Sequence, residues 1–440
     1  MMNAGLSAHS GSFSEMQKDC LYSLALPSGE SVPVCWSDAL LREARGHIVV
    51  RHPSRLAVLT RLDNYPNIKR LLDPCAGLAD LAALKRQAHG WLSEGFYIFG
   101  AFKVGLRVAR HAQSLGVEVK GFLDNDRTKA GGSLEGLSIH HPSTAALENA
   151  VVVIASGRHG NAISSQLSQV PGIRLVNMHE FLYALDGAGP GLGCEKFASF
   201  AEAPLHDPWR FISAFLCLDD ESSRTVFDAL IGMRIGLSIK GAEQAKSPWD
   251  EEYFDKAFVR PEHALRFVDA GAAAGDTLHR LERHFGPVEQ AWLFEPELPA
   301  YYEALKGFSD RPNVWLFNMG LDEVPSRATY QPELSYDIAG ELSSAVPASI
   351  TSFIQGVPLD AVVPGRVGLF KLDIEGMEAS ALRGARTVIK RDKPALAVCA
   401  YHRSDDYWCL IDEVQSIRDD YKVGIRLYAD ILEDITLYFH

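Results

Sequence analysis

Long apolar runs are absent from this sequence, and no segment is both apolar and long enough, at about 18 residues, to span a bilayer as a helix. Positive charge is also in short supply: 43 lysines and arginines stand against 56 aspartates and glutamates, for a net charge of −13. This balance disfavours nucleic acid and anionic membrane surfaces as partners, because neither would meet a basic face. The amino-terminal residues lack the basic and apolar regions of a signal peptide, so we expect a cytoplasmic protein.

Cysteine is scarce and scattered. The seven cysteines include no Cys-x-x-Cys pair. They therefore indicate reduced thiols, and neither a disulfide framework nor a zinc site. We predict no metal site.

Apolar residues, in contrast, are present in sufficient number for large cores. The 440 residues are 47% hydrophobic and 22% charged, which is typical of a soluble chain with two or three domains. The pattern predicts a disordered tail, a mainly helical segment, a Rossmann-like βαβ domain, a linker with a helical lead-in, and a second α/β domain. Their bounds are 1–16, 17–94, 95–186, 187–262 and 263–440.

The last domain contains seven short apolar strands, with helices predicted in most of the gaps. The strands are Arg266–Ala270, Gln290–Glu295, Val314–Asn318, Gly368–Asp373, Ala395–Tyr401, Val423–Tyr428 and Ile435–Phe439. Apolar strands that alternate with helices predict a doubly wound parallel sheet. Only about six residues separate the last two strands, too few for a helical crossover, so the last strand must run antiparallel.

A glycine turn follows the first of these strands. It comprises Asp269, Ala270, Gly271, Gly275, Asp276 and Thr277. The second strand ends in Glu295, 26 positions after Asp269. Glycines let a ligand approach the backbone, and a carboxylate at the tip of the second strand is placed to bind ribose hydroxyls. Together they predict a site for a nucleoside-bearing cofactor, although a glycine turn alone is as often a simple connection.

Polar residues also follow the other strands. The carboxyl ends of parallel strands meet at one edge of a sheet, where such sheets bind their ligands. The candidates at this edge are Asn318 after the third strand, Lys371, Asp373 and Glu375 at the fourth, and Tyr401, His402 and Arg403 at the fifth. Each has an alternative when taken singly: Asp373 and Glu375 can cap the helix that starts near Ala379, and His402 can be structural.

From about residue 205 onward, the sequence resembles the S-adenosylmethionine-dependent methyltransferases of the FkbM type. The resemblance rests on Tyr253-Phe254, the glycine turn with Glu295, the block Lys371-Leu372-Asp373-Ile374-Glu375-Gly376-Met377-Glu378 followed by Leu382-Arg383-Gly384-Ala385, and Tyr401-His402-Arg403 with Asp405, Asp406 and Trp408. Seven strands with the last antiparallel are also the class I methyltransferase order. Two departures from the family pattern are the alanines at 272–274 and Leu427 after Arg426.

The resemblance implies S-adenosyl-L-methionine as the cofactor, bound by the glycine turn together with Glu295, Asn318 and Asp373. It implies a sugar, glycan or related polar metabolite as the acceptor, and we assign Lys371, Tyr401 and Arg403 to it.

Transfer to a hydroxyl needs a general base near the methyl group, and we predict His402 in that role, alone or with Asp373 or Glu375. A divalent ion held by Asp373 and Glu375 is the weaker alternative.

The domain at 95–186 has a glycine turn of its own, Gly100-Ala101-Phe102-Lys103-Val104-Gly105. Phe102 replaces the central glycine of a dinucleotide fingerprint, where the backbone must meet a pyrophosphate, so NAD is disfavoured. With Gly121-Phe122-Leu123-Asp124-Asn125-Asp126, the unit resembles the small Rossmann-like domains that recognise sugar nucleotides. The resemblance implies a nucleotide-sugar or glycan site, and a structural or dimerising domain is the alternative.

Three classes of function therefore remain open from the sequence. The first is a methyltransferase that acts on a hydroxyl of a small molecule or glycan. The second is a non-catalytic nucleotide- or sugar-binding scaffold, and the third is a nicotinamide-dependent oxidoreductase. The sequence leaves the oligomeric state undecided, and a homo-oligomer is compatible with it.

Overall fold

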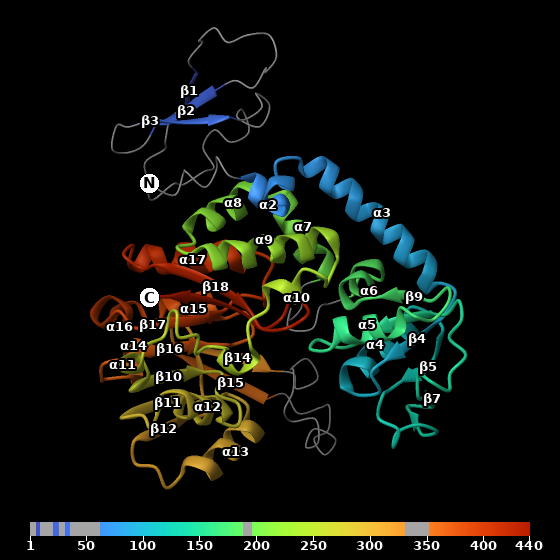
Figure 1. The fold of residues 1–440 in the computed structure, drawn as a ribbon. Coiled ribbons are helices and arrows are strands. Elements are labelled where there is room, and N and C mark those ends of the chain that lie inside the picture. Colours follow the sequence, from blue (N-terminus) through green and yellow to red (C-terminus); the bar gives the residue numbers. More distant parts are fainter. Residues whose placement is uncertain (1–5, 9–20, 26–30, 36–61, 188–195, 331–351) are drawn as a thin grey trace. The chain divides into compact units, whose positions relative to one another are not determined.

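The computed structural model describes residues 6–8, 21–25, 31–35, 62–187, 196–330 and 352–440, which Figure 1 draws as ribbons. The chain divides into two compact units. The first comprises the residues up to Gly187 together with Ala198–Gln244, and the second comprises Ala245–His440 with a short segment that ends at Phe197. The helices predicted as a lead-in to the last domain thus belong largely to the first unit. Within the described ranges, no helix has the length and apolarity that crossing a membrane requires.

The first unit combines a small amino-terminal sheet, a group of helices and a larger α/β sheet. Its elements are β1 (Leu6–Ala8), β2 (Leu21–Ala25), β3 (Ser31–Cys35), α2 (Pro66–Arg70), α3 (Pro74–Leu92), β4 (Phe96–Phe99), α4 (Lys103–Ser114), β5 (Val119–Leu123), β6 (Ser133–Leu134), β7 (Leu137–His140), β8 (Val151–Ile154), α5 (Gly160–Leu167), β9 (Arg174–Val176), α6 (Met178–Ala184), α7 (Phe197–His206), α8 (Pro208–Cys217) and α9 (Glu221–Gly236). The larger sheet has the order β6-β7-β5-β4-β8-β9. Its pairings are parallel except for β6 with β7.

The prediction of a mainly helical segment at 17–94 is wrong for its first part. β2 and β3 pair antiparallel there. Pro66 and Pro74 are the first residues of α2 and α3. Proline is tolerated there because the first turn of a helix has no partner for its N–H groups. Of the predicted disordered tail, only β1 lies within the described residues.

The second unit contains the sheet that the sequence predicted. Its elements are α10 (Ala242–Ala245, at the unit boundary), the 3₁₀ helix η2 (Trp249–Glu251), α11 (Pro261–Ala264), β10 (Arg266–Ala270), α12 (Asp276–Phe285), β11 (Gln290–Phe294), α13 (Leu298–Phe308), β12 (Val314–Phe317), β13 (Gly320–Leu321), β14 (Ser326–Tyr330), β15 (Ser352–Val357), α14 (Leu359–Val362), β16 (Leu369–Leu372), α15 (Glu378–Arg383), α16 (Arg386–Asp392), β17 (Ala395–Cys399), α17 (Asp406–Ile417), β18 (Val423–Leu427) and β19 (Ile435–Phe439). Seven strands form one sheet in the order β12-β11-β10-β16-β17-β19-β18.

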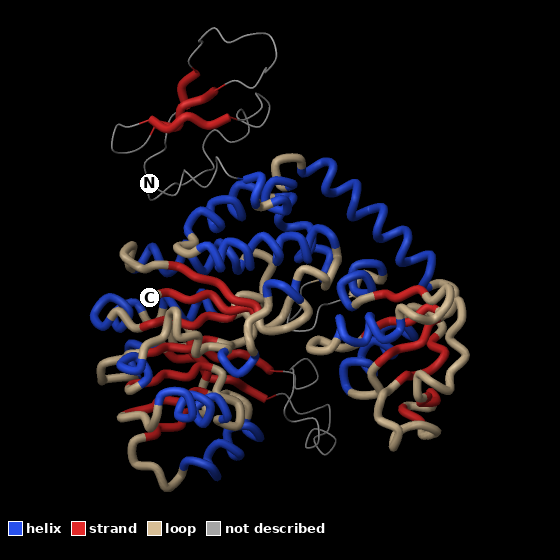
Figure 2. The backbone as a smooth tube through the Cα atoms, in the orientation of Figure 1, coloured by secondary structure: helices blue, strands red, loops and turns tan. Residues whose placement is uncertain are grey.

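This sheet confirms the predicted doubly wound architecture. The pairings from β12 to β17 are parallel, and β19 runs antiparallel to both β17 and β18. Helices lie on both sides of the strands in the tube of Figure 2. On one side, Phe267 of β10 and Leu293 of β11 pack with Leu278 and Leu281 of α12 in one buried cluster. From β10 the chain adds β11 and β12 on one side and then returns to add β16 and β17 on the other side. The strand order therefore reverses between β10 and β16, which places a switch point at their carboxyl ends.

A second sheet, β13-β15-β14, was missed by the sequence analysis. It is inserted between β12 and β16 and is tied to α15, because the Ser380 hydroxyl donates to Asp322 Oδ1 at 2.5 Å. A Cβ on Gly384 would lie 2.0 Å from the Asp322 carbonyl oxygen. The helix predicted to start near Ala379 divides at this glycine into α15 and α16. The insertion therefore supports the helix that presents Glu378.

Candidate active site

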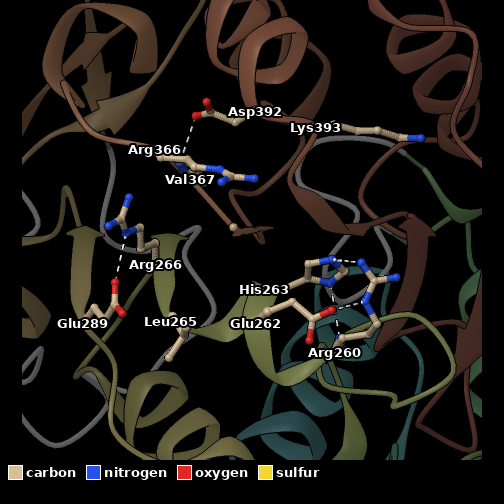
Figure 3. A pocket seen from close by; sticks show the side chains of 11 residues that line it. Arg260, Glu262, His263, Leu265, Arg266, Glu289, Arg366, Val367, Asp392 and Lys393 are labelled. Carbon is tan, nitrogen blue, oxygen red and sulfur yellow. Dashed lines mark hydrogen bonds and ion pairs between the residues drawn. The ribbon is translucent and has the colours of Figure 1, made fainter.

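The predicted site residues all lie in the second unit, at or just beyond the carboxyl ends of β10, β11, β12, β16 and β17. These strands are neighbours in the sheet, so the residues share one edge. A cavity of about 510 Å³ lies at the opposite edge, where the same strands begin, and includes none of them (Figure 3). The candidate site is therefore defined by its side chains and backbone.

The glycine turn after β10 is packed tightly against the neighbouring strand ends. Gly271 has φ +80°, and a Cβ on it would lie 1.8 Å from the Asp373 carbonyl oxygen. Gly275 has φ +85°, and a Cβ there would lie 2.3 Å from the Phe308 ring. Both positions therefore require glycine. The N–H groups of Gly271 and Ala272 each donate to the Phe294 carbonyl oxygen at 3.0 Å, which ties the turn to β11.

Glu295 lies directly beside this turn. Its side chain accepts hydrogen bonds from the Ala273 N–H at 2.8 Å and the Glu297 N–H at 2.7 Å, one on each oxygen. The residue is buried, and burial raises the pKa of Glu295 to about 7. Asn318 Nδ2 donates at 3.0 Å to the carbonyl oxygens of both Glu295 and Pro296. Asn318 therefore holds the loop that carries the carboxylate, and its direct contact with a cofactor stays a prediction.

Lys371 and Asp269 form a buried ion pair beneath the turn. Lys371 Nζ lies 3.0 Å from Asp269 Oδ1 and donates to the Gly271 carbonyl oxygen at 2.6 Å. Burial raises the pKa of Asp269 to about 6, against the opposing effect of the lysine. Burial disfavours the charged lysine, but the charges of Asp269 and Asp373 hold its pKa above the ordinary value. The pair thus fixes the glycine turn, and its predicted contacts with cofactor or substrate are untested.

Three of the remaining predicted residues have simple environments. Asp276 is exposed and Thr277 is buried, in the first turn of α12. Ala270 is fully buried, and its carbonyl oxygen accepts a hydrogen bond from Lys371 Nζ at 3.2 Å. The exposed carboxylate of Asp276 at a helix N-terminus is favourable for the helix, and it faces solvent beside the turn.

Asp373 follows β16 and accepts hydrogen bonds from two tyrosines. The Tyr253 hydroxyl donates to Oδ2 at 2.9 Å, and the Tyr401 hydroxyl donates to Oδ1 at 3.1 Å. Burial favours the neutral acid, but Lys371 and His402 hold the pKa of Asp373 below its ordinary value. Asp373 is therefore ionised near neutral pH, with both oxygens already engaged.

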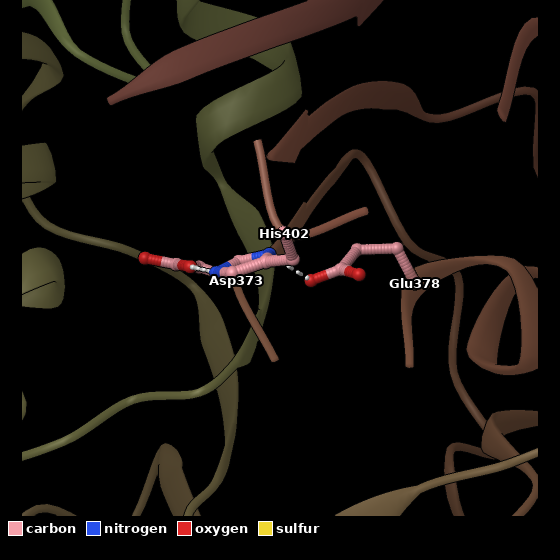
Figure 4. Close-up of side chains that lie close together, drawn as sticks. All are labelled: Asp373, Glu378 and His402. Carbon is pink, nitrogen blue, oxygen red and sulfur yellow. Dashed lines mark ion pairs between the residues drawn. The ribbon is translucent and has the colours of Figure 1, made fainter. Parts of the chain in front are cut away.

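His402 lies between two carboxylates (Figure 4). Its Nδ1 is 3.0 Å from Glu378 Oε1, and its Nε2 is 3.4 Å from Asp373 Oδ1. The ring is buried, which disfavours its charged form, but the carboxylates of Glu378 and Asp373 outweigh this effect and raise the pKa of His402 to about 10. The ring is thus an imidazolium at neutral pH, with a carboxylate within ion-pair distance of each nitrogen.

Glu375 occupies the outer side of this cluster. Its side chain is 55% exposed, and Oε2 lies 3.8 Å from His402 Nε2. Partial burial raises the pKa of Glu375 to about 7; His402 opposes this rise, and the carboxylate of Asp373 adds to it. The backbone of Glu375 has φ +57°, in the left-handed region that costs a non-glycine residue about 1–3 kcal/mol. Strained backbone of this kind concentrates at functional sites.

Asp406 orders the loop after β17. Its Oδ2 accepts hydrogen bonds from the N–H groups of His402 at 2.9 Å and Arg403 at 2.8 Å. Burial raises the pKa of Asp406 to about 8. The Arg403 side chain is 54% exposed and lies 3.6 Å from Asp405, so Arg403 is accessible to a substrate at the same edge.

One group in the described part of the chain has the spacing of metal ligands: Asp373, Glu378 and His402, which offer atoms within 4.8 Å of one another. A histidine must be neutral to bind a metal. The ring instead has a carboxylate at each nitrogen, an arrangement that favours the protonated form. The three groups therefore form an ionic cluster when the ring is protonated, and they would hold a metal ion only with the ring neutral.

Sequence reasoning missed two residues of this cluster. Glu378 closes the Lys-x-Asp-x-Glu-Gly-x-Glu block and is fully buried, with Oε1 accepting from the Ile374 N–H at 2.9 Å. Tyr253 lies 120 positions before Asp373. The final acid of the block was an available signal for Glu378, whereas no local pattern connects Tyr253 with the strand ends.

The glycine turn of the first unit has a different environment. A Cβ on Gly105 would lie 1.9 Å from the Gly100 carbonyl oxygen, so these glycines allow α4 to pack against the end of β4. Asp124 accepts from the Ala101 N–H at 3.1 Å and pairs with Lys129 Nζ at 2.8 Å. Phe102 is 43% exposed. Ligand binding at this turn stays a prediction.

Comparison with known proteins finds similarity to methyltransferases in the second unit. Residues 270–427 match the family model of the methyltransferase FkbM domain. A methyltransferase FkbM from Methylobacillus flagellatus KT has a similar structure: the sequences are 22% identical, the match covers 84% of this chain and 100% of that chain, and the TM-score is 0.64. No curated protein matches the chain.

Two further solved structures match a smaller part of the chain. One is a putative rRNA-methylase from Clostridium thermocellum, 11% identical over 43% of this chain and 92% of that chain, with a TM-score of 0.28. The other is fibrillarin from Aeropyrum pernix in complex with S-adenosyl-L-methionine, 15% identical over 41% of this chain and 69% of that chain, with a TM-score of 0.27.

The family match begins at the end of β10 and ends at the end of β18. It therefore includes the glycine turn, Glu295, the Lys371–Glu378 block and His402. The second unit of this chain therefore contains the segment that matches the methyltransferase FkbM domain.

Proposed function

We propose that this protein is an S-adenosyl-L-methionine-dependent methyltransferase that methylates a hydroxyl of a sugar, glycan or related polar metabolite. The observation that carries the proposal is the contact between the glycine turn and the carboxylate of Glu295, through the Ala273 N–H at 2.8 Å. The FkbM domain match over residues 270–427 supports the methyl transfer. The sugar or glycan acceptor rests on the family resemblance.

The residues of the edge fit such a cofactor. When bound, S-adenosylmethionine supplies a methyl group that its sulfonium makes reactive, so the protein must mainly orient and desolvate the reactants. The close packing at Gly271 holds the backbone of the turn against the end of β16, beside Asp373. Two backbone N–H groups hold Glu295, and the remaining lone pairs of its carboxylate are able to accept the two hydroxyls of a ribose.

The cluster around His402 changes the assignment of the general base. A histidine with a pKa of about 10 is protonated at neutral pH, so it cannot accept a proton there. Asp373 has both oxygens engaged by tyrosine hydroxyls. Glu375 is exposed and has a pKa of about 7, close to the value that suits a general base. We therefore assign the proton transfer to Glu375, with His402 as the cation that holds Asp373 and Glu375 in place.

Calorimetry with S-adenosylmethionine and with NAD on the full chain tests the proposal. We expect binding of the first and none of the second, and weaker binding in Glu295→Ala with the fold intact. Binding of NAD alone would overturn the proposal in favour of an oxidoreductase.

Incubation of the protein with methyl-labelled cofactor and a fractionated polar cell extract then tests turnover. We expect label in a hydroxylated metabolite or glycan fraction. Cofactor binding without label in any fraction would favour the scaffold alternative.

A further inference from the structure

The cavity of about 510 Å³ in the second unit lies at the amino edge of the sheet. Its lining includes Arg266, the first residue of β10, Glu289, which precedes β11, and Gly368, which precedes β16. The candidate active site is at the carboxyl ends of the same strands, about 13 Å away for strands of this length. The cavity is therefore separate from the methyl-transfer site, and its volume is within the usual range for small-molecule pockets.

Positive charge gathers in this cavity, although the whole chain has a net charge of −13. Four of the lining residues carry a fixed positive charge, and three carry a carboxylate, which leaves a charge of +1 (4 − 3). The cations are Arg260, Arg266, Arg366 and Lys393, and the carboxylates are Glu262, Glu289 and Asp392. Figure 3 shows Arg266 with Glu289 and Arg260 with Glu262 on different sides of the cavity.

The carboxylates are already engaged inside the protein. Glu262 pairs with Arg260 at 2.5 Å, and Glu289 pairs with Arg266 at 3.2 Å. Asp392 pairs with Arg391, which is outside the lining, at 2.7 Å. These pairs compensate the charges of the carboxylates and equally those of Arg260 and Arg266.

Arg366 differs from the other cations. It is exposed, and within the described residues it has neither a hydrogen bond nor an ion pair. Burial raises the pKa of Asp392, but Arg391, the Val367 N–H and the charge of Arg366 together hold it below the ordinary value. Lys393 lies at the rim, where its Nζ is 3.1 Å from Asp420. The guanidinium of Arg366 is thus available to a ligand.

We propose that this cavity binds a small phosphate-bearing ligand, with Arg366 as its principal contact. A guanidinium presents several donors in one plane and binds phosphate oxygens in pairs. Arg266 and Lys393 lie around it at the strand starts, each paired with a carboxylate. Since the cavity is at the opposite edge from Glu295 and His402, this ligand is an effector or a tethering group, and neither the methyl donor nor the acceptor. The proposal stands independently of the proposed function.

Calorimetry of the full chain with inorganic pyrophosphate tests the site. We expect saturable binding to the natural protein and at least tenfold weaker binding to Arg366→Gln. Arg386→Gln is the matched control, because Arg386 is also exposed in the second unit, begins α16 and is not part of the lining. The control should bind pyrophosphate as the natural protein does. Circular dichroism of both variants verifies the fold.

Two results would overturn the proposal. One is the absence of pyrophosphate binding at millimolar concentration, and the other is equal binding by the natural protein and Arg366→Gln. Malonate, a small dicarboxylate, is the second probe. Tighter binding of malonate than of pyrophosphate would contradict the phosphate assignment, whereas weaker binding supports it.

Discussion

Two glycine turns in this protein share an outline and differ in what they do. In each, a glycine approaches a carbonyl oxygen more closely than any residue with a Cβ could. A Cβ on Gly105 would lie 1.9 Å from the Gly100 carbonyl oxygen, and a Cβ on Gly271 would lie 1.8 Å from the Asp373 carbonyl oxygen. The first approach packs a helix onto its own strand. The second joins the turn to the next strand, at the switch point of its sheet.

The acids beside the two turns show the same contrast. Asp124 and Glu295 each accept a hydrogen bond from an N–H of their turn. Asp124 also pairs with Lys129 at 2.8 Å, so its charge is compensated. Glu295 accepts only backbone N–H groups among the contacts of the described residues, and burial raises its pKa. A carboxylate held by neutral donors keeps its capacity for a polar ligand, which is the reason we propose the cofactor at the second turn and not at the first.

Gly271→Ala should have the largest effect. Steric overlap and the positive φ together should lower the free energy of unfolding by about 3 kcal/mol or more and abolish cofactor binding. Denaturant unfolding and calorimetry measure the two effects. Gly286→Ala is the control, since Gly286 has φ +88° but open space around it, and it should cost only about 1 kcal/mol. Gly105→Ala should destabilise the first unit without changing cofactor affinity, and loss of affinity there would break the contrast between the turns.

His402→Gln should lower stability by about 3–5 kcal/mol at neutral pH, because it leaves buried carboxylates without their cation. The pKa of His402 is raised from 6.5 to about 10, so its stabilising effect is complete below pH 6.5 and lost as the pH rises to about 10. Unfolding of both proteins in urea at pH 6, 8 and 10 measures this difference. Asp124→Asn, which breaks the more exposed pair of the first unit, should cost less than about 1 kcal/mol. A His402→Gln difference that is constant with pH would contradict the imidazolium.

Glu375→Gln should reduce methyl transfer by about 10²–10⁴-fold, with cofactor affinity nearly unchanged, because general bases contribute rate enhancements of this size. Activity of the natural protein should rise as the pH increases through about 7, where Glu375 ionises, and the variant should lose this rise. Transfer of labelled methyl groups measures both effects. Glu303→Gln, on the exposed side of α13, is the control. Full activity of Glu375→Gln would show that another residue acts as the general base.

Glu295→Ala should weaken S-adenosylmethionine binding by about 10–100-fold, the usual effect of losing hydrogen bonds to a charged group. Affinity should increase as the pH rises through about 7, because the ionised carboxylate accepts hydroxyl hydrogens and the neutral acid donates one. Glu295→Gln should remove this pH dependence. Asp124→Asn should leave affinity unchanged, and a comparable loss there would mean that the first turn also binds the cofactor.

Metal removal should have the smallest effect. Dialysis against EDTA should leave methyl transfer within about twofold, because both nitrogens of His402 face carboxylates and the ring is protonated. Restoration of lost activity by Mg²⁺ or Mn²⁺ would instead make Asp373, Glu378 and His402 a metal site.

The strand ends were predictable because apolar strands and turn glycines are local signals. β10, β11 and β19 begin where the sequence places them, and Glu295 follows β11 as expected. The small sheet β13-β15-β14 was missed, since its short strands have a weak pattern and pair across an insertion. No local pattern in the sequence predicted that residues 198–244 pack with the first unit. Such assignments depend on packing between distant segments.

By itself, the sequence determined the parallel sheet, its antiparallel last strand, and the set of polar residues along one edge. Their roles depended on tertiary structure, because a side chain's charge state follows from its neighbours. Only the fold placed Glu378 and Asp373 on either side of His402 and made that ring a cation. Only the fold brought Tyr253 to Asp373 and left Arg366 exposed beside a cavity. Residue type sets what a group is able to do, and burial with partner charges sets which of those capacities it has.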